Sequence, residues 1–197
     1  MRKRWFIVLA TTPLWAEPAF AHTGAGVAGG FGAGFMHPLS GLDHLLAMVS
    51  VGIWGAFLGR PLIWALPVAF PLIMVVGGVL GILGVPLPFV EVGVSASVIA
   101  LGLAITAAWR APSAIAVAII AAFGLFHGYA HGVELPHAAS PAAYASGFVL
   151  ATGLLHLSGI AIGMLLGLRG GTALLRTAGA LIAVTGVWIM AGTLGLA

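Results

Sequence analysis

Residues 61–84 read PLIWALPVAFPLIMVVGGVLGILG and contain no charged side chain. An α-helix rises about 1.5 Å per residue, so about 20 apolar residues cross the roughly 30 Å hydrocarbon core of a bilayer. The stretch therefore predicts a transmembrane helix. Five further apolar stretches meet the same criterion, and they are 31–58, 89–109, 112–134, 141–168 and 172–195.

The composition also indicates a membrane protein. Hydrophobic residues make up 61% of the chain, charged residues make up 6%, and the mean hydropathy is +1.19. Soluble domains carry about 25% charged residues, so this chain cannot cover itself with a polar surface. We expect one all-α bundle whose partner is the lipid bilayer, and a homo-oligomer is left open. The lack of cysteine excludes disulfides, and a net charge of +3 without a basic patch excludes a nucleic-acid partner.

The first 21 residues have the pattern of a cleavable signal peptide. A positive segment, residues 2–4, is followed by a short apolar segment and by the sequence Ala19-Phe20-Ala21, which is typical of a signal peptidase site. Cleavage there divides the chain into a signal peptide, 1–21, and a transmembrane domain, 22–197. The alternative is an uncleaved first membrane helix, but the apolar run is short and prolines interrupt it.

The arginines predict the orientation. The connections between the six stretches are short, so consecutive helices should be antiparallel. With the mature N-terminus outside the cytoplasm, three connections become cytoplasmic, and every arginine of the mature chain lies in or beside one of them: Arg60, Arg110, Arg169 and Arg176. This agrees with the positive-inside rule. We therefore expect six transmembrane helices in a bacterial inner membrane, with both mature termini in the periplasm.

Ionisable side chains at membrane depth are costly and usually mark a site or a pathway. One group lies in residues 37–44, which read HPLSGLDH. In a continuous helix, His37 and His44 share one face and lie two turns, or roughly 10 Å, apart. Asp43 can reach a neighbouring helix or orient a histidine that binds metal. The alternative is a structural Asp43–His44 pair, with His37 at the membrane interface.

A second group lies in residues 126–137, which read FHGYAHGVELPH. His127 and His131 are four residues apart and Glu134 follows three later, so all three share one stripe of a helix. This is a metal-chelating spacing for two histidines with a nearby carboxylate, although a lone histidine would more often be a core residue. The helix runs outward, so the pair should lie at the depth of the first group. His137 falls in the following loop.

Three other residues extend this pattern. His156 lies near the middle of its helix, where it is either a deeper position on a metal pathway or a satisfied core residue. His22 would begin the mature chain, and its free α-amine and imidazole could capture a divalent ion. Glu91 begins a helix, where a carboxylate is favoured by the helix dipole.

Imidazole and carboxylate ligands without thiolates suit borderline divalent ions such as Ni²⁺, Co²⁺ and Zn²⁺. A copper(I) pathway would use Cys or Met, whereas Mg²⁺ and Ca²⁺ prefer oxygen ligands. We therefore expect a divalent cation as the bound species, and no organic cofactor.

The segments HPLSGLDH and FHGYAHGVE resemble the two signature motifs of the HupE/UreJ family, and the resemblance covers the whole chain. It implies a six-helix nickel or cobalt permease associated with hydrogenase or urease, in which Ni²⁺ or Co²⁺ is the transported substrate. By position, the resemblance assigns the metal-binding role to a set drawn from both motifs: His37, Asp43, His44, His127, His131 and Glu134.

Two functions of other classes remain open. A bound Zn²⁺ with nearby histidines could activate water in an intramembrane metal-dependent hydrolase. Against this, the chain contains neither HExxH nor GxSG. The protein could also be an accessory subunit that binds metal without transporting it.

Overall fold

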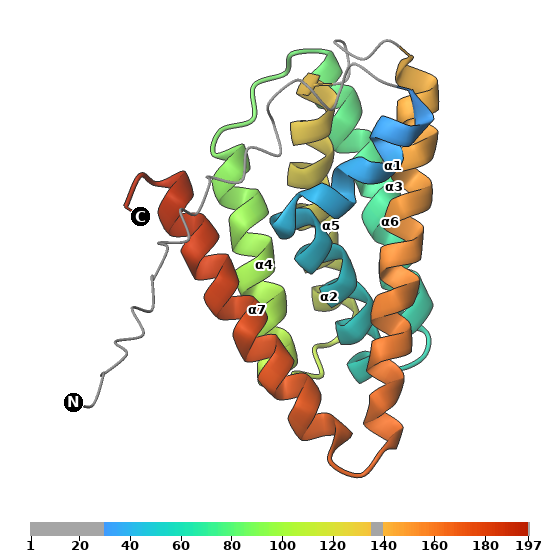
Figure 1. Cartoon of the computed structure of the whole chain (residues 1–197), viewed down its shortest axis with the longest axis vertical. Coiled ribbons are helices and arrows are strands. Elements are labelled where there is room, and N and C mark those ends of the chain that lie inside the picture. The colour runs from blue at the N-terminus through green and yellow to red at the C-terminus, as the bar shows by residue number, and fades with distance from the viewer. Residues whose placement is uncertain (1–29, 135–139, 197) are drawn as a thin grey trace, which may run out of the picture.

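The computed structural model describes residues 30–134 and 140–196. The predicted signal peptide 1–21, His22 and His137 lie outside the described residues. The described chain is helical throughout its regular structure, in the order α1 (Phe31–Ser40), α2 (Leu42–Leu58), α3 (Leu62–Ile82), α4 (Val90–Thr106), α5 (Ser113–Glu134), α6 (Pro141–Gly163), the short 3₁₀ helix η2 (Met164–Gly167) and α7 (Gly171–Thr193). The helices pack side by side in one bundle (Figure 1).

The first predicted helix is broken, so the expectation of one continuous helix over 31–58 is wrong. α1 and α2 meet at an angle of 82°, and the break falls at Gly41, whose backbone is extended. The Ser40 hydroxyl donates to the carbonyl oxygen of His37 at 2.8 Å, and the Gly41 N–H donates to the same oxygen at 3.3 Å. Local bonds of this kind compete with helix continuation. α1 therefore lies inclined across the upper part of the bundle (Figure 1).

The other helices agree with the predicted stretches to within a few residues. Four of them, α3, α5, α6 and α7, are long and apolar enough to cross a membrane, and the broken pair α1–α2 makes a fifth candidate span. α4 has 17 residues and is shorter. These lengths and compositions support a multi-pass membrane protein, and the count of six spans stays a prediction.

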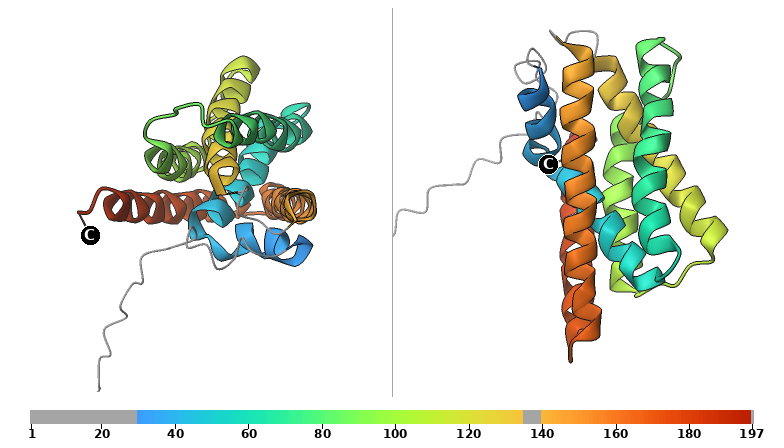
Figure 2. Two further views of the ribbon diagram at one scale, coloured as in Figure 1. Left: turned by 90° about the horizontal axis from the view of Figure 1, so that it is seen from above. Right: turned by 90° about the vertical axis from the view of Figure 1, so that its right-hand side faces the viewer.

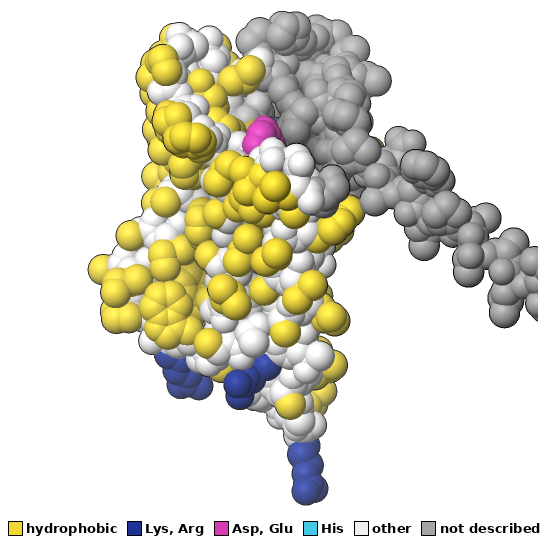
Figure 3. All heavy atoms as spheres, turned by 90° about the vertical axis from the view of Figure 1, so that its left-hand side faces the viewer, with side chains coloured by type: hydrophobic (Ala, Val, Ile, Leu, Met, Phe, Trp, Pro, Cys, Tyr) yellow, Lys and Arg dark blue, Asp and Glu magenta, His cyan; other side chains and the backbone are white. Residues whose placement is uncertain are grey.

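The outer surface is apolar, as lipid contact requires. Large hydrophobic side chains on α3 and α7 are exposed, among them Trp64, Leu72 and Leu181. Figure 3 shows hydrophobic side chains over one face of the bundle, with the arginines visible there gathered at one end. The turns between α2 and α3, α4 and α5, and η2 and α7 all lie at that end (Figure 1). The arginines are thus arranged as the predicted orientation requires.

Glycines allow the helices to approach closely. A side-chain carbon at Gly128 of α5 would collide with the backbone of Met74 in α3, and one at Gly132 would collide with the backbone of Gly78. α2 and α6 are in similar contact where Gly52 meets the backbone of His156. Gly128 and Gly132 thus let α3 approach α5 closely. Figure 2 shows these helices from above and from the side.

Candidate metal-binding site

Both predicted groups of ionisable residues lie inside the bundle. The break at Gly41 places His37 in the last turn of α1 and His44 in the first turn of α2, on either side of one bend. The straight helix α5 supplies His127 and His131 one turn apart. All four side chains are buried, and none is more than 7% exposed. We refer to these four residues as the histidine cluster.

The four imidazole rings contact one another. The ring centroids of His37 and His131 are 4.8 Å apart, and those of His44 and His131 are 4.6 Å apart. His44 also lies 4.7 Å from His127. The predicted similar depth of the two groups is consistent with these contacts. The predicted separation of roughly 10 Å between His37 and His44 is wrong: their rings are 6.0 Å apart because the chain bends between them.

Asp43 acts on the cluster through His44. One carboxylate oxygen of Asp43 lies 2.8 Å from His44 Nδ1 and also accepts the backbone N–H of His44 at 2.8 Å. Asp43 is itself buried, at 8% exposure. A carboxylate can only accept when ionised, so it holds the proton of the neutral ring on Nδ1. The lone pair then lies on Nε2, and the ring is oriented as metal-binding histidines commonly are.

Ser97 of α4 has the same role toward His127, and the sequence did not single it out. Its Oγ lies 2.9 Å from His127 Nε2 and 2.6 Å from the carbonyl oxygen of Val94. The hydroxyl has one proton, which it donates to the carbonyl, so it accepts from the Nε2–H of His127. The lone pair of His127 then lies on Nδ1. In the sequence, the only signal for this contact is a serine within an apolar predicted helix.

Aromatic side chains surround the cluster, and these were also missed. From α6, Phe148 lies 4.3 Å from His131, and Tyr144 lies 5.9 Å from His37, measured between ring centroids. From α3, Phe70 lies 5.4 Å from His127. Tyr144 and Phe148 are four residues apart and so share one face of α6. They enclose the rings in apolar surroundings.

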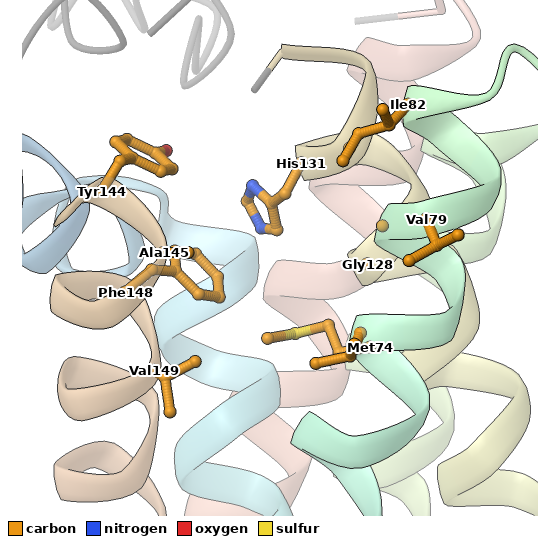
Figure 4. A pocket seen from close by; sticks show the side chains of 12 residues that line it. Met74, Val79, Ile82, Gly128, His131, Tyr144, Ala145, Phe148 and Val149 are labelled. Carbon is orange, nitrogen blue, oxygen red and sulfur yellow. The ribbon is translucent and has the colours of Figure 1, made fainter. Parts of the chain in front are cut away.

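A pocket of about 180 Å³ lies beside His131, between α3, α5 and α6. Figure 4 shows His131, Tyr144 and Phe148 at one part of its wall, with Met74 and Val79 of α3 across from Phe148. The wall is almost wholly apolar, and His131 and Tyr144 are its polar side chains. His131, which also belongs to the histidine cluster, is therefore the one side chain of the pocket wall with an imidazole that could bind an ion.

The cluster is packed ring against ring and is not a formed coordination cage. Within the described ranges, no three histidine or acidic side chains are spaced to hold a metal ion as they stand. Imidazoles are donors that Ni²⁺ and Co²⁺ accept, but the side chains would have to rotate before their lone pairs met at one point.

The remaining predicted residues stand apart from this cluster or are not described in full. Glu134 is the last residue of α5, and its side chain lies outside the described part of the structure. Glu91 lies in the first turn of α4, as predicted. His156 is buried in α6, and the ring of Phe70 contacts both it and His127.

These features define a class: an all-helical, multi-pass membrane protein with a buried imidazole cluster built from a broken helix and its neighbour. Comparison with known proteins gives the family. The family model described as HupE / UreJ protein matches residues 9–189, and the chain belongs to that family. It is 40% identical over 186 residues to Protein HupE of Rhizobium leguminosarum bv. viciae, which covers 94% of this chain and 97% of that protein. No solved structure matches the chain significantly.

Proposed function

We propose that the protein is an inner-membrane permease that carries Ni²⁺ or Co²⁺ from the periplasm to the cytoplasm for maturation of urease or hydrogenase. The family is associated with nickel and cobalt uptake for these enzymes. The observation that carries the proposal is the contact of four buried imidazoles from α1, α2 and α5. Buried ionisable groups within a membrane bundle usually line a substrate pathway.

The residues have distinct roles in this proposal. His37, His44, His127 and His131 bind the ion in passing, and Asp43 orients His44 and offsets the positive charge of the ion. Glu134 lies at the periplasmic end of α5 and receives the ion first, with His22 as an additional capture group. Both mature termini are then periplasmic, and the arginine-rich end of the bundle faces the cytoplasm.

The membrane potential suffices to drive such transport. Moving one charge through 100 mV releases roughly 2.3 kcal/mol, so a divalent cation moving inward gains about 4.6 kcal/mol. Coupling to a proton is therefore not required.

The test is uptake of radioactive Ni²⁺ and Co²⁺ into proteoliposomes, with and without a pH gradient. Separate replacement of His37, Asp43, His44, His127 and His131 by alanine should abolish uptake. Leu154→Ala is the control, because Leu154 is 49% exposed on the outer face of α6. Unchanged uptake in all five variants would refute the proposal. Metal binding without flux would indicate an accessory protein, and metal-dependent lipid or peptide hydrolysis without flux would indicate a hydrolase.

A further inference from the structure

Among the described residues, the side chain of His156 makes one hydrogen bond, and a proline explains it. Its Nδ1 lies 3.2 Å from the carbonyl oxygen of Pro67 in α3. In a helix that carbonyl would accept the N–H of residue 71, but residue 71 is proline and has none. The freed carbonyl can only accept, so the His156 Nδ1–H donates to it. This bond fixes the tautomer of the ring, and the lone pair lies on Nε2.

That lone pair has no partner among the described residues. His156 is 1% exposed, and its Nε2 is buried without a hydrogen bond. Thr152, one turn earlier on the same face of α6, is fully buried, and its Oγ1 also makes no bond. Buried polar atoms are nearly always paired in native proteins. Two unpaired atoms on one face of a helix therefore indicate a ligand.

The behaviour of the other threonines strengthens this observation. A helical threonine commonly donates its hydroxyl to the carbonyl four residues earlier. Four threonines in this bundle do so, namely Thr106, Thr177, Thr185 and Thr193. Thr152 makes no such bond, although it has a full turn of α6 before it. The Thr152 hydroxyl can therefore bond to a ligand that lies outside α6.

The pair lies deeper in the bundle than the histidine cluster. α5 ends and α6 begins at the same end of the molecule (Figure 1). His127 lies about 10 Å from that end of α5, whereas His156 lies about 22 Å along α6, at about 1.5 Å per residue. The ring of Phe70 contacts both histidines, with centroids 5.4 Å from His127 and 5.5 Å from His156.

We propose that His156 Nε2 and Thr152 Oγ1 form an inner relay site, which receives the divalent ion after it leaves the histidine cluster. The inference rests on the proposed transport function. One imidazole and one hydroxyl, completed by water, bind a divalent ion weakly. A weak second site beyond a stronger one allows the ion to move on, as conduction requires.

The decisive variant is His156→Asn. Its side-chain N–H can take the place of the Nδ1–H and keep the bond to the Pro67 carbonyl, but it offers no donor atom at the position of Nε2. His156→Gln is the reverse case, because its longer side chain can place an oxygen near that position. Thr152→Val removes the inner hydroxyl without changing shape. Ser158→Ala is its control, since Ser158 lies on the same helix and is exposed.

The measurements are Ni²⁺ flux in proteoliposomes and Ni²⁺ affinity of the purified protein by titration calorimetry. His156→Asn should lower flux strongly and should leave the affinity of the histidine cluster unchanged. His156→Gln should retain more flux than His156→Asn, Thr152→Val should lower flux severalfold, and Ser158→Ala should have no effect.

Two results would overturn the inference. If His156→Asn transports like the wild type, or transports better than His156→Gln, then His156 serves only to satisfy the Pro67 carbonyl. If the wild-type protein shows no flux at all, the transport function fails and the relay site fails with it. Wild-type flux together with normal flux in His156→Asn removes the relay site alone and leaves the transport function standing.

Discussion

Replacing Ser97 by alanine tests whether Ni²⁺ binding depends on the hydrogen bond that orients His127. Ser97 is fully buried and makes no lipid contact, and its Oγ lies 2.9 Å from His127 Nε2. The substitution removes one hydroxyl and leaves the Nε2–H of His127 without its acceptor in an apolar interior. A buried donor that loses its partner costs about 1–3 kcal/mol. The ring can then rotate or change tautomer, and either change moves the lone pair on Nδ1.

The expected effect on metal binding follows from this geometry. Loss of a group that orients a metal-binding histidine typically lowers affinity about 10–100-fold. We expect Ser97→Ala to weaken Ni²⁺ binding by that factor and to reduce flux at low Ni²⁺, while saturating Ni²⁺ restores part of the flux. Affinity is measured by titration calorimetry on the purified protein, and flux is measured in proteoliposomes.

Ser95→Ala is a matched control. Ser95 lies on the same helix and is equally buried, at 2% exposure. Its hydroxyl bonds to the carbonyl oxygen of Glu91 and lies 3.3 Å from the hydroxyl of Thr193, on another face of α4. In a His127→Ala background, Ser97→Ala should have no further effect on affinity, because the two residues act through one bond. Equal losses in Ser95→Ala and Ser97→Ala, or full additivity with His127→Ala, would refute the reasoning.

Two further predictions follow from the structure. Asp43→Asn keeps an acceptor for His44 Nδ1 but removes the negative charge. It should therefore lower Ni²⁺ affinity about 10–100-fold and leave the helix content unchanged by circular dichroism. Affinity equal to that of the wild type would show that the charge does not contribute to binding. Gly128→Ala should lower the thermal unfolding temperature in detergent, because the added carbon meets the backbone of Met74. Gly153→Ala is the control and should not lower it, because there is open space around Gly153. Equal unfolding temperatures of the two variants would contradict the close packing of α3 and α5.

The sequence predicted the helices well because apolar runs and their interruptions determine membrane spans directly. The predicted stretch 61–84 contains α3, Leu62–Ile82, and the stretch 112–134 contains α5, Ser113–Glu134. Proline, glycine and arginine separate these runs, and several helix boundaries fall at such residues, namely Gly41, Gly59, Pro61 and Gly170. The family assignment was also available from sequence, because the two motifs are short, polar and set in an apolar background.

The sequence did not predict which side chains would meet across helices. In a soluble helix the apolar stripe shows which face is buried, but a helix that is apolar all round gives no such signal. Ser97, Phe70, Tyr144 and Phe148 therefore could not be assigned to the cluster in advance. The four histidines could be assigned to the cluster, because ionisable groups inside a membrane bundle usually face its interior and pair with one another.

The broken first helix explains why HPLSGLDH contains polar residues besides its two histidines. A break in a membrane helix leaves backbone groups that water cannot satisfy, and each costs several kcal/mol if left alone. Ser40 and Gly41 both donate to the His37 carbonyl oxygen, and Asp43 accepts the backbone N–H of His44. The polar residues between the two histidines thus stabilise the bend. In a straight helix without the bend, His37 would lie two turns, or roughly 10 Å, from His44. The ring of His37 would then no longer contact His131, and the cluster would lose one imidazole.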